Sequence, residues 1–139
     1  MINKLKQVFG APSLGIAVLL TMIAIPAAYG EEIIKSDVPF AFKVGSKTLP
    51  AGAYEFQIHR TDDFVSVIGA TRAKASEAVE PIMTSLAAPS HSTAADAHLV
   101  FDKVGGTYTL SELWEPNLEG VLVHATKGKH EHHVIHVKK

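Results

Sequence analysis

The sequence of 139 residues contains no cysteine. This absence excludes disulfide bonds, thiolate metal sites, cysteine nucleophiles and CxxC redox chemistry. An excess of either charge is also missing, because 13 basic and 14 acidic residues give a formal net charge of −1. A nucleic-acid-binding protein usually needs a concentrated basic face, so we expect no nucleic-acid partner.

Long apolar runs are scarce as well. The longest uncharged apolar run is Leu14–Ile25, and its 12 residues are fewer than the roughly 20 that a membrane-spanning helix needs. Lysines precede this run, and the small residues Ala28 and Gly30 stand shortly before Glu31. This layout is typical of a cleaved secretory signal peptide over residues 1–30, with an uncleaved N-terminal anchor as the alternative. We therefore expect export to the periplasm or the medium, with no membrane span in the mature chain.

Residues 31–139 have room for one domain. Short runs of alternating apolar and polar residues are separated in this region by glycine, proline, asparagine and aspartate. Alternation with a period of two is typical of half-buried strands. We expect seven or eight short strands and no long helix. The pattern predicts a single all-β domain, built as an antiparallel sandwich or a small barrel.

The clearest expected hairpin contains two glycines, Gly105 and Gly106, which permit the positive φ angles of a tight turn. In the strand after this turn, alternation predicts that Tyr108, Leu110, Glu112 and Trp114 share one face. The last two strands are expected to form a histidine-rich hairpin over residues 120–139. The expected strands are Val38–Val44, Ala53–His59, Phe64–Ile68, Glu80–Leu86, His98–Val104, Thr107–Trp114, Gly120–Thr126 and His130–Val137.

Two stretches, VPFAFKVGSKTLPAGAYEF and LVFDKVGGTYTLSELWEP, resemble a family of small secreted proteins of soil bacteria. The resemblance implies export and a β fold, and it implies no particular activity. This chain departs from the family pattern at its end, where a histidine-rich tail replaces a basic and acidic one. The residues that carry the resemblance are Val38, Pro39, Phe40, Phe42, Gly45, Lys47 to Gly52, Tyr54, Leu99 to Phe101, Tyr108, Leu110 to Glu112 and Trp114.

Five of the eight histidines lie in the last 16 residues. Neutral imidazoles bind Zn²⁺, Cu²⁺ or Ni²⁺, and a clustered set can supply several ligands. If Ala125 paired with His130, His124 would lie opposite Glu131, although a slip of one residue would destroy this arrangement. The alternative is a solvated strand with no cofactor. The candidate metal ligands are His124, His130, Glu131, His132, His133 and His136.

Motifs for catalysis are not found, because the sequence has no GxSxG nucleophile elbow and no glycine-rich phosphate loop. We therefore expect a protein that is not an enzyme. The sequence favours an exported β module with a binding or structural role, and binding of Cu, Zn or Ni through the C-terminal histidines is the alternative. Self-association or a protein partner is expected along exposed strand edges, at Val38–Val44 and at the C-terminal strand.

Overall fold

The computed structural model describes residues 32–70 and 77–137, which belong to the compact unit Glu31–Lys139. The predicted signal peptide over residues 1–30 lies outside the described residues. Eleven β-strands and no helix occur in the described ranges, which confirms the prediction of an all-β fold. Accordingly, this part of the chain has no helix long and apolar enough to cross a membrane.

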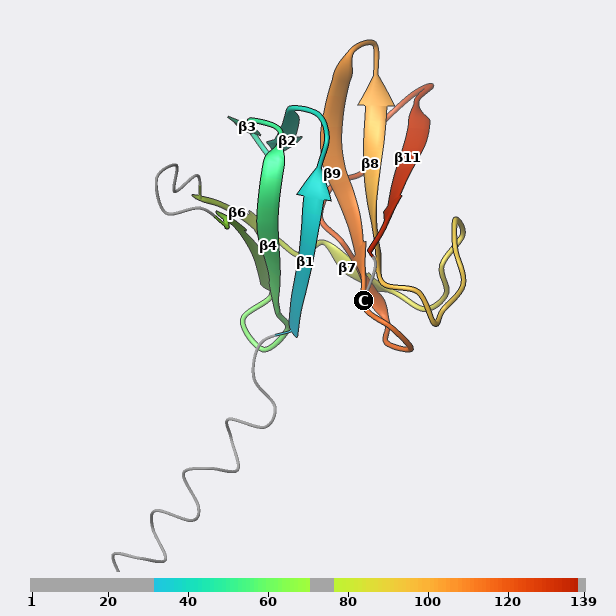
Figure 1. Ribbon diagram of the computed structural model, residues 1–139. Helices are drawn as coiled ribbons and strands as arrows, with labels where there is room; N and C mark the ends of the chain where they lie inside the picture. Colours follow the sequence, from blue (N-terminus) through green and yellow to red (C-terminus); the bar gives the residue numbers. More distant parts are fainter. Residues whose placement is uncertain (1–31, 71–76, 138–139) are drawn as a thin grey trace, which may run out of the picture. The chain divides into compact units, whose positions relative to one another are not determined.

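The strands form two open sheets that lie face to face as a sandwich (Figure 1). The first sheet is antiparallel and has the order β1-β4-β5-β6. Its strands are β1 (Glu32–Val38), β4 (Gly52–His59), β5 (Phe64–Gly69) and β6 (Glu77–Pro81).

The second sheet has seven strands, and its main path has the order β11-β8-β9-β10-β7. One edge of β9 is shared, because β10 pairs with its end while β2 pairs in parallel with its beginning. Strand β3 pairs with β2. The bounds are β2 (Phe42–Val44), β3 (Lys47–Leu49), β7 (Thr84–Leu86), β8 (His98–Val104), β9 (Thr107–Trp114), β10 (Gly120–Leu122) and β11 (Glu131–His136).

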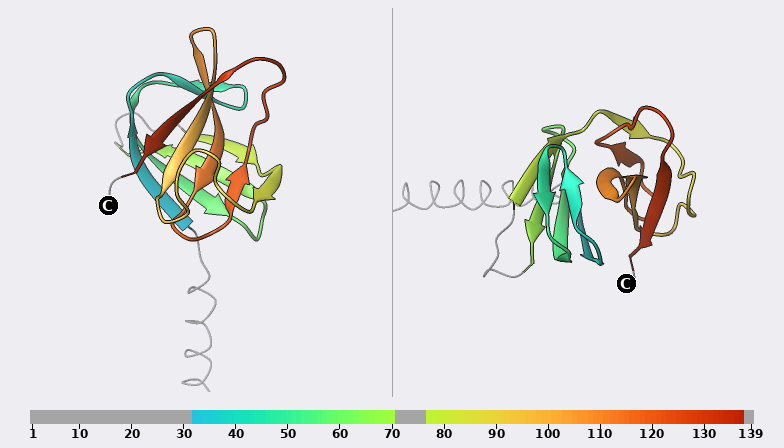
Figure 2. Two further views of the ribbon diagram at one scale, coloured as in Figure 1. Left: turned by 90° about the vertical axis from the view of Figure 1, so that its right-hand side faces the viewer. Right: turned by 90° about the horizontal axis from the view of Figure 1, so that it is seen from above.

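Apolar side chains from the facing sides of the two sheets form the core, and Figure 2 shows the two layers edge-on from above. Phe42 of the second sheet contacts Tyr54 and Phe56 of the first, with ring centroids 5.1 and 6.3 Å apart. It also meets Phe101 at 5.4 Å. Full burial of one such side chain contributes about 1.5–3 kcal/mol, so these aromatic contacts stabilise the packing of one sheet on the other.

A β-bulge changes the faces of the hairpin formed by β8 and β9. The pairing register shifts in the middle of the hairpin, which makes Ser111 an extra residue on β9. Leu110 therefore lies in the core, whereas Glu112 and Trp114 lie on the opposite face, where the indole Nε1 donates to Glu112 Oε1 at 2.9 Å. The prediction that Tyr108, Leu110, Glu112 and Trp114 share one face is wrong, because the bulge interrupts the alternation.

Two of the expected strands are divided. Strand β1 ends at Val38, before Pro39, which has no N–H to donate to a strand ladder. The rest of the expected strand Val38–Val44 forms β2 in the other sheet. The expected strand Glu80–Leu86 is likewise divided between β6 of the first sheet and β7 of the second. These two divisions and the unexpected strand β3 account for the difference between the eight ranges expected and the eleven strands observed.

The expected C-terminal hairpin over residues 120–139 is not formed. Strand β10 pairs with β9 and β7, so both of its edges are occupied. Strand β11 pairs instead with the free edge of β8, from Glu131 opposite Lys103 to His136 opposite His98. The expected pairing of Ala125 with His130 is therefore wrong, because β7 and β9 occupy both edges of β10 and leave none free for β11.

Candidate metal centre

Strand β11 brings two histidines against a buried carboxylate of β8, on the side of the second sheet that faces away from the core. Asp102 is only 2% exposed. Its Oδ1 lies 3.0 Å from His132 Nδ1 and 4.0 Å from His130 Nε2, and its Oδ2 accepts a hydrogen bond from Thr126 Oγ1 at 2.8 Å. One ligand atom from each of Asp102, His130 and His132 lies within 4.8 Å of the others. These three residues form the candidate metal group.

The hydrogen bonds around the group place the imidazole protons. A carbonyl oxygen only accepts, so His130 Nδ1, which lies 2.8 Å from the Gly128 oxygen, carries the proton and leaves a lone pair on Nε2. Gly128 has a φ of +85°, a conformation that favours glycine and orients this carbonyl. The carboxylate of Asp102 also only accepts, so His132 Nδ1 donates to it. Metal binding at this nitrogen displaces its proton.

The spacing of the group suits a first-row divalent ion. Zinc ligands lie about 2.0–2.2 Å from the metal, so two ligands of a tetrahedral ion lie about 3.3 Å apart. The observed separations of 3.0 and 4.0 Å fall on either side of this value. Two imidazoles and one carboxylate are donors that Zn²⁺, Cu²⁺ and Ni²⁺ accept. The donor set and its geometry therefore fit such an ion.

The candidate ligands His133 and His136 lie elsewhere on β11. His133 is on the opposite face of the strand, where its ring contacts the rings of Phe40 at 5.2 Å and Tyr108 at 5.6 Å. His136 lies at the far end of β11 opposite His98, with ring centroids 6.2 Å apart. Neither residue belongs to the metal group, because strand alternation and length separate them from Asp102.

His124 and Glu131 also lie outside the metal group. The backbone of His124 is held at the bulge, where its carbonyl accepts the Ser111 hydroxyl at 2.7 Å. Glu131 lies opposite Lys103 and is exposed. Sequence reasoning missed Asp102, although a single acidic residue directly after the apolar run Leu99–Phe101 is a signal that could have indicated it.

The sheet edges agree only in part with the prediction. Strand β11 is an edge of the second sheet, and β1 is an edge of the first. Strand β2 is not an edge, because it lies between β3 and β9.

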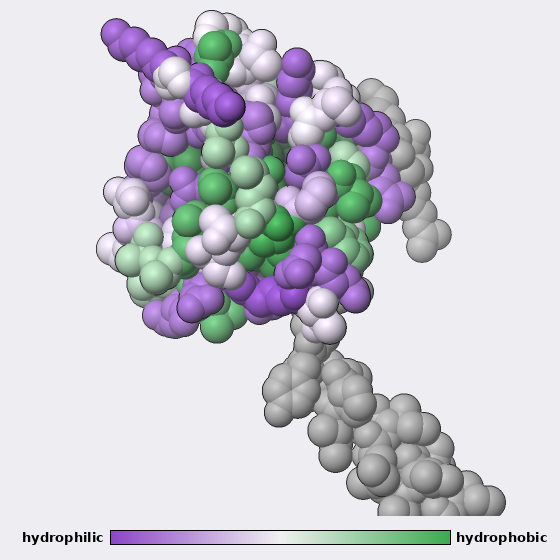
Figure 3. Space-filling model, turned by 180° about the vertical axis from the view of Figure 1, so that it is seen from behind, coloured by the Kyte–Doolittle hydropathy of each residue, from purple (hydrophilic) through white to green (hydrophobic). Residues whose placement is uncertain are grey.

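A groove of about 680 Å³ lies between the two edge strands, β1 and β11, and is lined by residues such as Lys35, Asp37 and Ile135. On the opposite side of the molecule, apolar and hydrophilic residues are interspersed at the surface (Figure 3).

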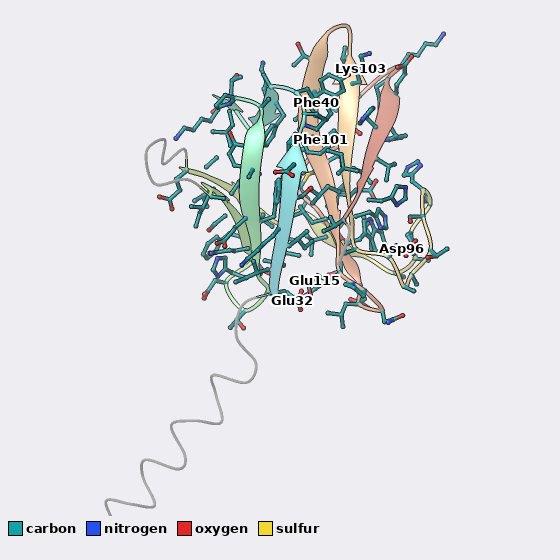
Figure 4. All side chains as sticks on the ribbon, viewed as in Figure 1. Glu32, Phe40, Asp96, Phe101, Lys103 and Glu115 are labelled. Atoms are coloured by element: carbon teal, nitrogen blue, oxygen red, sulfur yellow. The ribbon has the colours of Figure 1, made fainter. Side chains whose placement is uncertain are left out.

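A second polar cluster occupies one end of the sandwich, where Figure 4 places Glu32 and Glu115 close together. Arg60 Nε lies 2.9 Å from both carboxylate oxygens of Glu32, and Arg60 Nη2 donates to the Glu119 carbonyl at 2.5 Å. Burial raises the pKa of Glu115, the negative charge of Glu32 raises it further, and Arg60 opposes the rise. Because Arg60 bridges the start of β1 to the loop before β10, this cluster has a structural role.

Comparisons of the chain with protein-family models, with curated protein sequences and with solved structures found no match. The resemblance to small secreted proteins of soil bacteria therefore stays a prediction.

Proposed function

We propose that this protein is an exported, non-catalytic β-sandwich that binds one divalent transition-metal ion, Zn²⁺, Cu²⁺ or Ni²⁺, through Asp102, His130 and His132. One observation carries the proposal: three ligand atoms converge within 4.8 Å around a carboxylate that is 2% exposed. Export is supported by the basic start, apolar run and small residues within residues 1–30.

The burial of Asp102 supports a cation at this position. A buried carboxylate is costly unless it is paired or coordinates a metal. The Thr126 hydroxyl and the His132 imidazole donate hydrogen bonds to Asp102, and a bound divalent ion would also neutralise its charge. Solvent reaches the group at His132, whose side chain is 36% exposed, and a cavity of about 330 Å³ lies beside His130.

The test is calorimetric titration of the full-length chain, prepared without a histidine tag, with Zn²⁺, Cu²⁺ and Ni²⁺ at pH 7.5 and pH 5.5. We expect one stoichiometric site at pH 7.5 and weaker binding at pH 5.5, because ligation requires neutral imidazoles. Part of the heat should depend on the buffer, because the proton on His132 Nδ1 is released.

Two matched variants assign the site. Asp102→Asn keeps the shape of the side chain and removes its charge. Loss of a residue that only supports a metal ligand weakens metal binding roughly 10- to 100-fold, and we expect Asp102→Asn to weaken it by at least as much. Glu131→Gln removes a carboxylate that lies close in sequence but outside the group, and we expect no change. Equal binding by Asp102→Asn and the unmodified chain would refute the proposal, and so would an absence of stoichiometric binding.

A further inference from the structure

His91, in the loop of residues 87–97, lies directly against the metal group. Its ring centroid is 4.5 Å from that of His132, with the ring planes inclined by 39°. The loop runs along the side of β11 that faces away from the first sheet, which is also the side of the metal group (Figure 1). A third imidazole therefore lies beside those of His130 and His132, although His91 is distant from them in sequence.

The part of the loop that follows His91 is fixed in place. Ser92 Oγ lies 3.4 Å from His136 Nδ1, four residues along β11 from His132. The Asp96 carbonyl accepts a hydrogen bond from Nδ1 of the buried His98 at 2.9 Å. Because these contacts already hold the backbone beside His91, moving its imidazole onto a metal ion costs little further conformational entropy.

We propose that His91 is the fourth ligand of the metal ion, an inference that rests on the function proposed above. Three protein ligands leave a coordination position open to water or substrate, as in catalytic zinc sites, whereas four close the site. Because the His91 ring already contacts that of His132, rotation of the side chain is the movement that would bring its nitrogen to the ion. The ion then links the loop 87–97 to β8 and β11.

The fourth ligand determines what the site does. A closed site of three imidazoles and one carboxylate offers no position at which a substrate could bind the metal. The protein therefore holds the ion, either to store it or to fix the loop against the sheet. This consequence distinguishes a four-ligand site from an open site with two histidines and one carboxylate, which is the arrangement found in iron oxygenases.

The experiment measures the coordination of Co²⁺ and the affinity for Zn²⁺ in the full-length chain without a histidine tag. Water fills a coordination position that the protein leaves open, and added azide can replace that water and change the visible spectrum of Co²⁺, so azide reports whether a position is open. His91→Ala removes the ring, and His91→Phe keeps a ring against His132 without a ligand atom. His124→Ala is the control, because it removes a histidine that lies outside the metal group.

We expect azide to leave the Co²⁺ spectrum of the unmodified chain and of His124→Ala unchanged, and to change the spectrum of both His91 variants. Both should also bind Zn²⁺ at least about tenfold more weakly. If azide changes the spectrum of the unmodified chain as it changes that of His91→Phe, and both bind Zn²⁺ equally, His91 acts only by packing and the proposal is overturned, while the three-ligand site stands. If the unmodified chain binds neither ion, the proposed function fails together with its fourth ligand.

Discussion

Gly120, at the start of β10, packs against the ring of Trp114, and Gly120→Ala tests this close approach. A Cβ atom at position 120 would lie 2.5 Å from both Cδ2 and Cε2 of Trp114 and 2.7 Å from Cε3. The shortest of these distances is 0.9 Å inside the 3.4 Å at which ordinary van der Waals contact begins. Trp114 is 2% exposed and stacks on His98 with ring centroids 5.6 Å apart, so its ring cannot move freely into solvent.

The magnitude follows from this overlap. Extra atoms in a well-packed region cost about 1–3 kcal/mol of unfolding free energy. We expect Gly120→Ala to fall in the upper half of that range, because three atoms of one rigid ring are in the way. Gly106→Ala is the matched control, since a Cβ there meets nothing within 4 Å and Gly106 has no positive φ. Its effect should stay within about 0.5 kcal/mol.

The assay is urea unfolding followed by far-ultraviolet circular dichroism, which does not depend on the tryptophan. Trp114→Leu removes the obstacle, so the cost of Gly120→Ala should shrink by at least about 1 kcal/mol in that background. The reasoning is refuted if Gly120→Ala unfolds at the same urea concentration as Gly106→Ala. It is also refuted if the effects of Gly120→Ala and Trp114→Leu on the free energy of unfolding simply add in the double variant.

Two further predictions concern polar groups. The raised pKa of Glu115 means that the folded state holds this proton to a higher pH than the unfolded state, so its ionisation above the ordinary value of 4.5 destabilises the fold. Glu115→Gln should therefore raise the thermal midpoint relative to the unmodified chain at pH 7 but not at pH 4. An equal increase of the midpoint at the two pH values would contradict this explanation. Tyr54→Phe should cost about 0.5–1.5 kcal/mol in urea unfolding, because it removes the 2.5 Å hydrogen bond to the Pro50 carbonyl. Tyr108→Phe is the control for the ring, and an equal loss there would contradict the assignment to this hydrogen bond.

Local signals in the sequence were sufficient for the fold class and for the central hairpin. Alternation with period two predicts strands directly, and Gly105, with a φ of +60°, forms the turn that its position between two strands predicts. The strand Ala53–His59 was also predicted within one residue of β4. These features depend on residues close together in the chain, so the sequence alone is enough to identify them.

Features that depend on distant pairing could not be predicted in this way. The bulge at Ser111 is stabilised by the segment that follows β10, because the Ser111 carbonyl accepts the amide of Val123 at 2.8 Å. The partner of β11 is decided by which strand still has a free edge, and this choice brings Asp102 to His132. The sequence therefore indicated two residues of the candidate metal group, His130 and His132, but it did not place Asp102 beside them, because that requires the pairing of β11 with β8.

The parallel pairing of β2 with β9 has a consequence for the rate of folding. Phe42 lies opposite Tyr108, so this contact closes a long loop of chain, and β11 closes another on β8. Folds dominated by such distant contacts reach the native state in milliseconds to seconds, whereas helical bundles of similar size need microseconds to milliseconds. Asp102 meets His130 and His132 only when β11 docks on β8. During folding, the three residues proposed to bind a metal ion therefore come together only after β11 has joined the central hairpin.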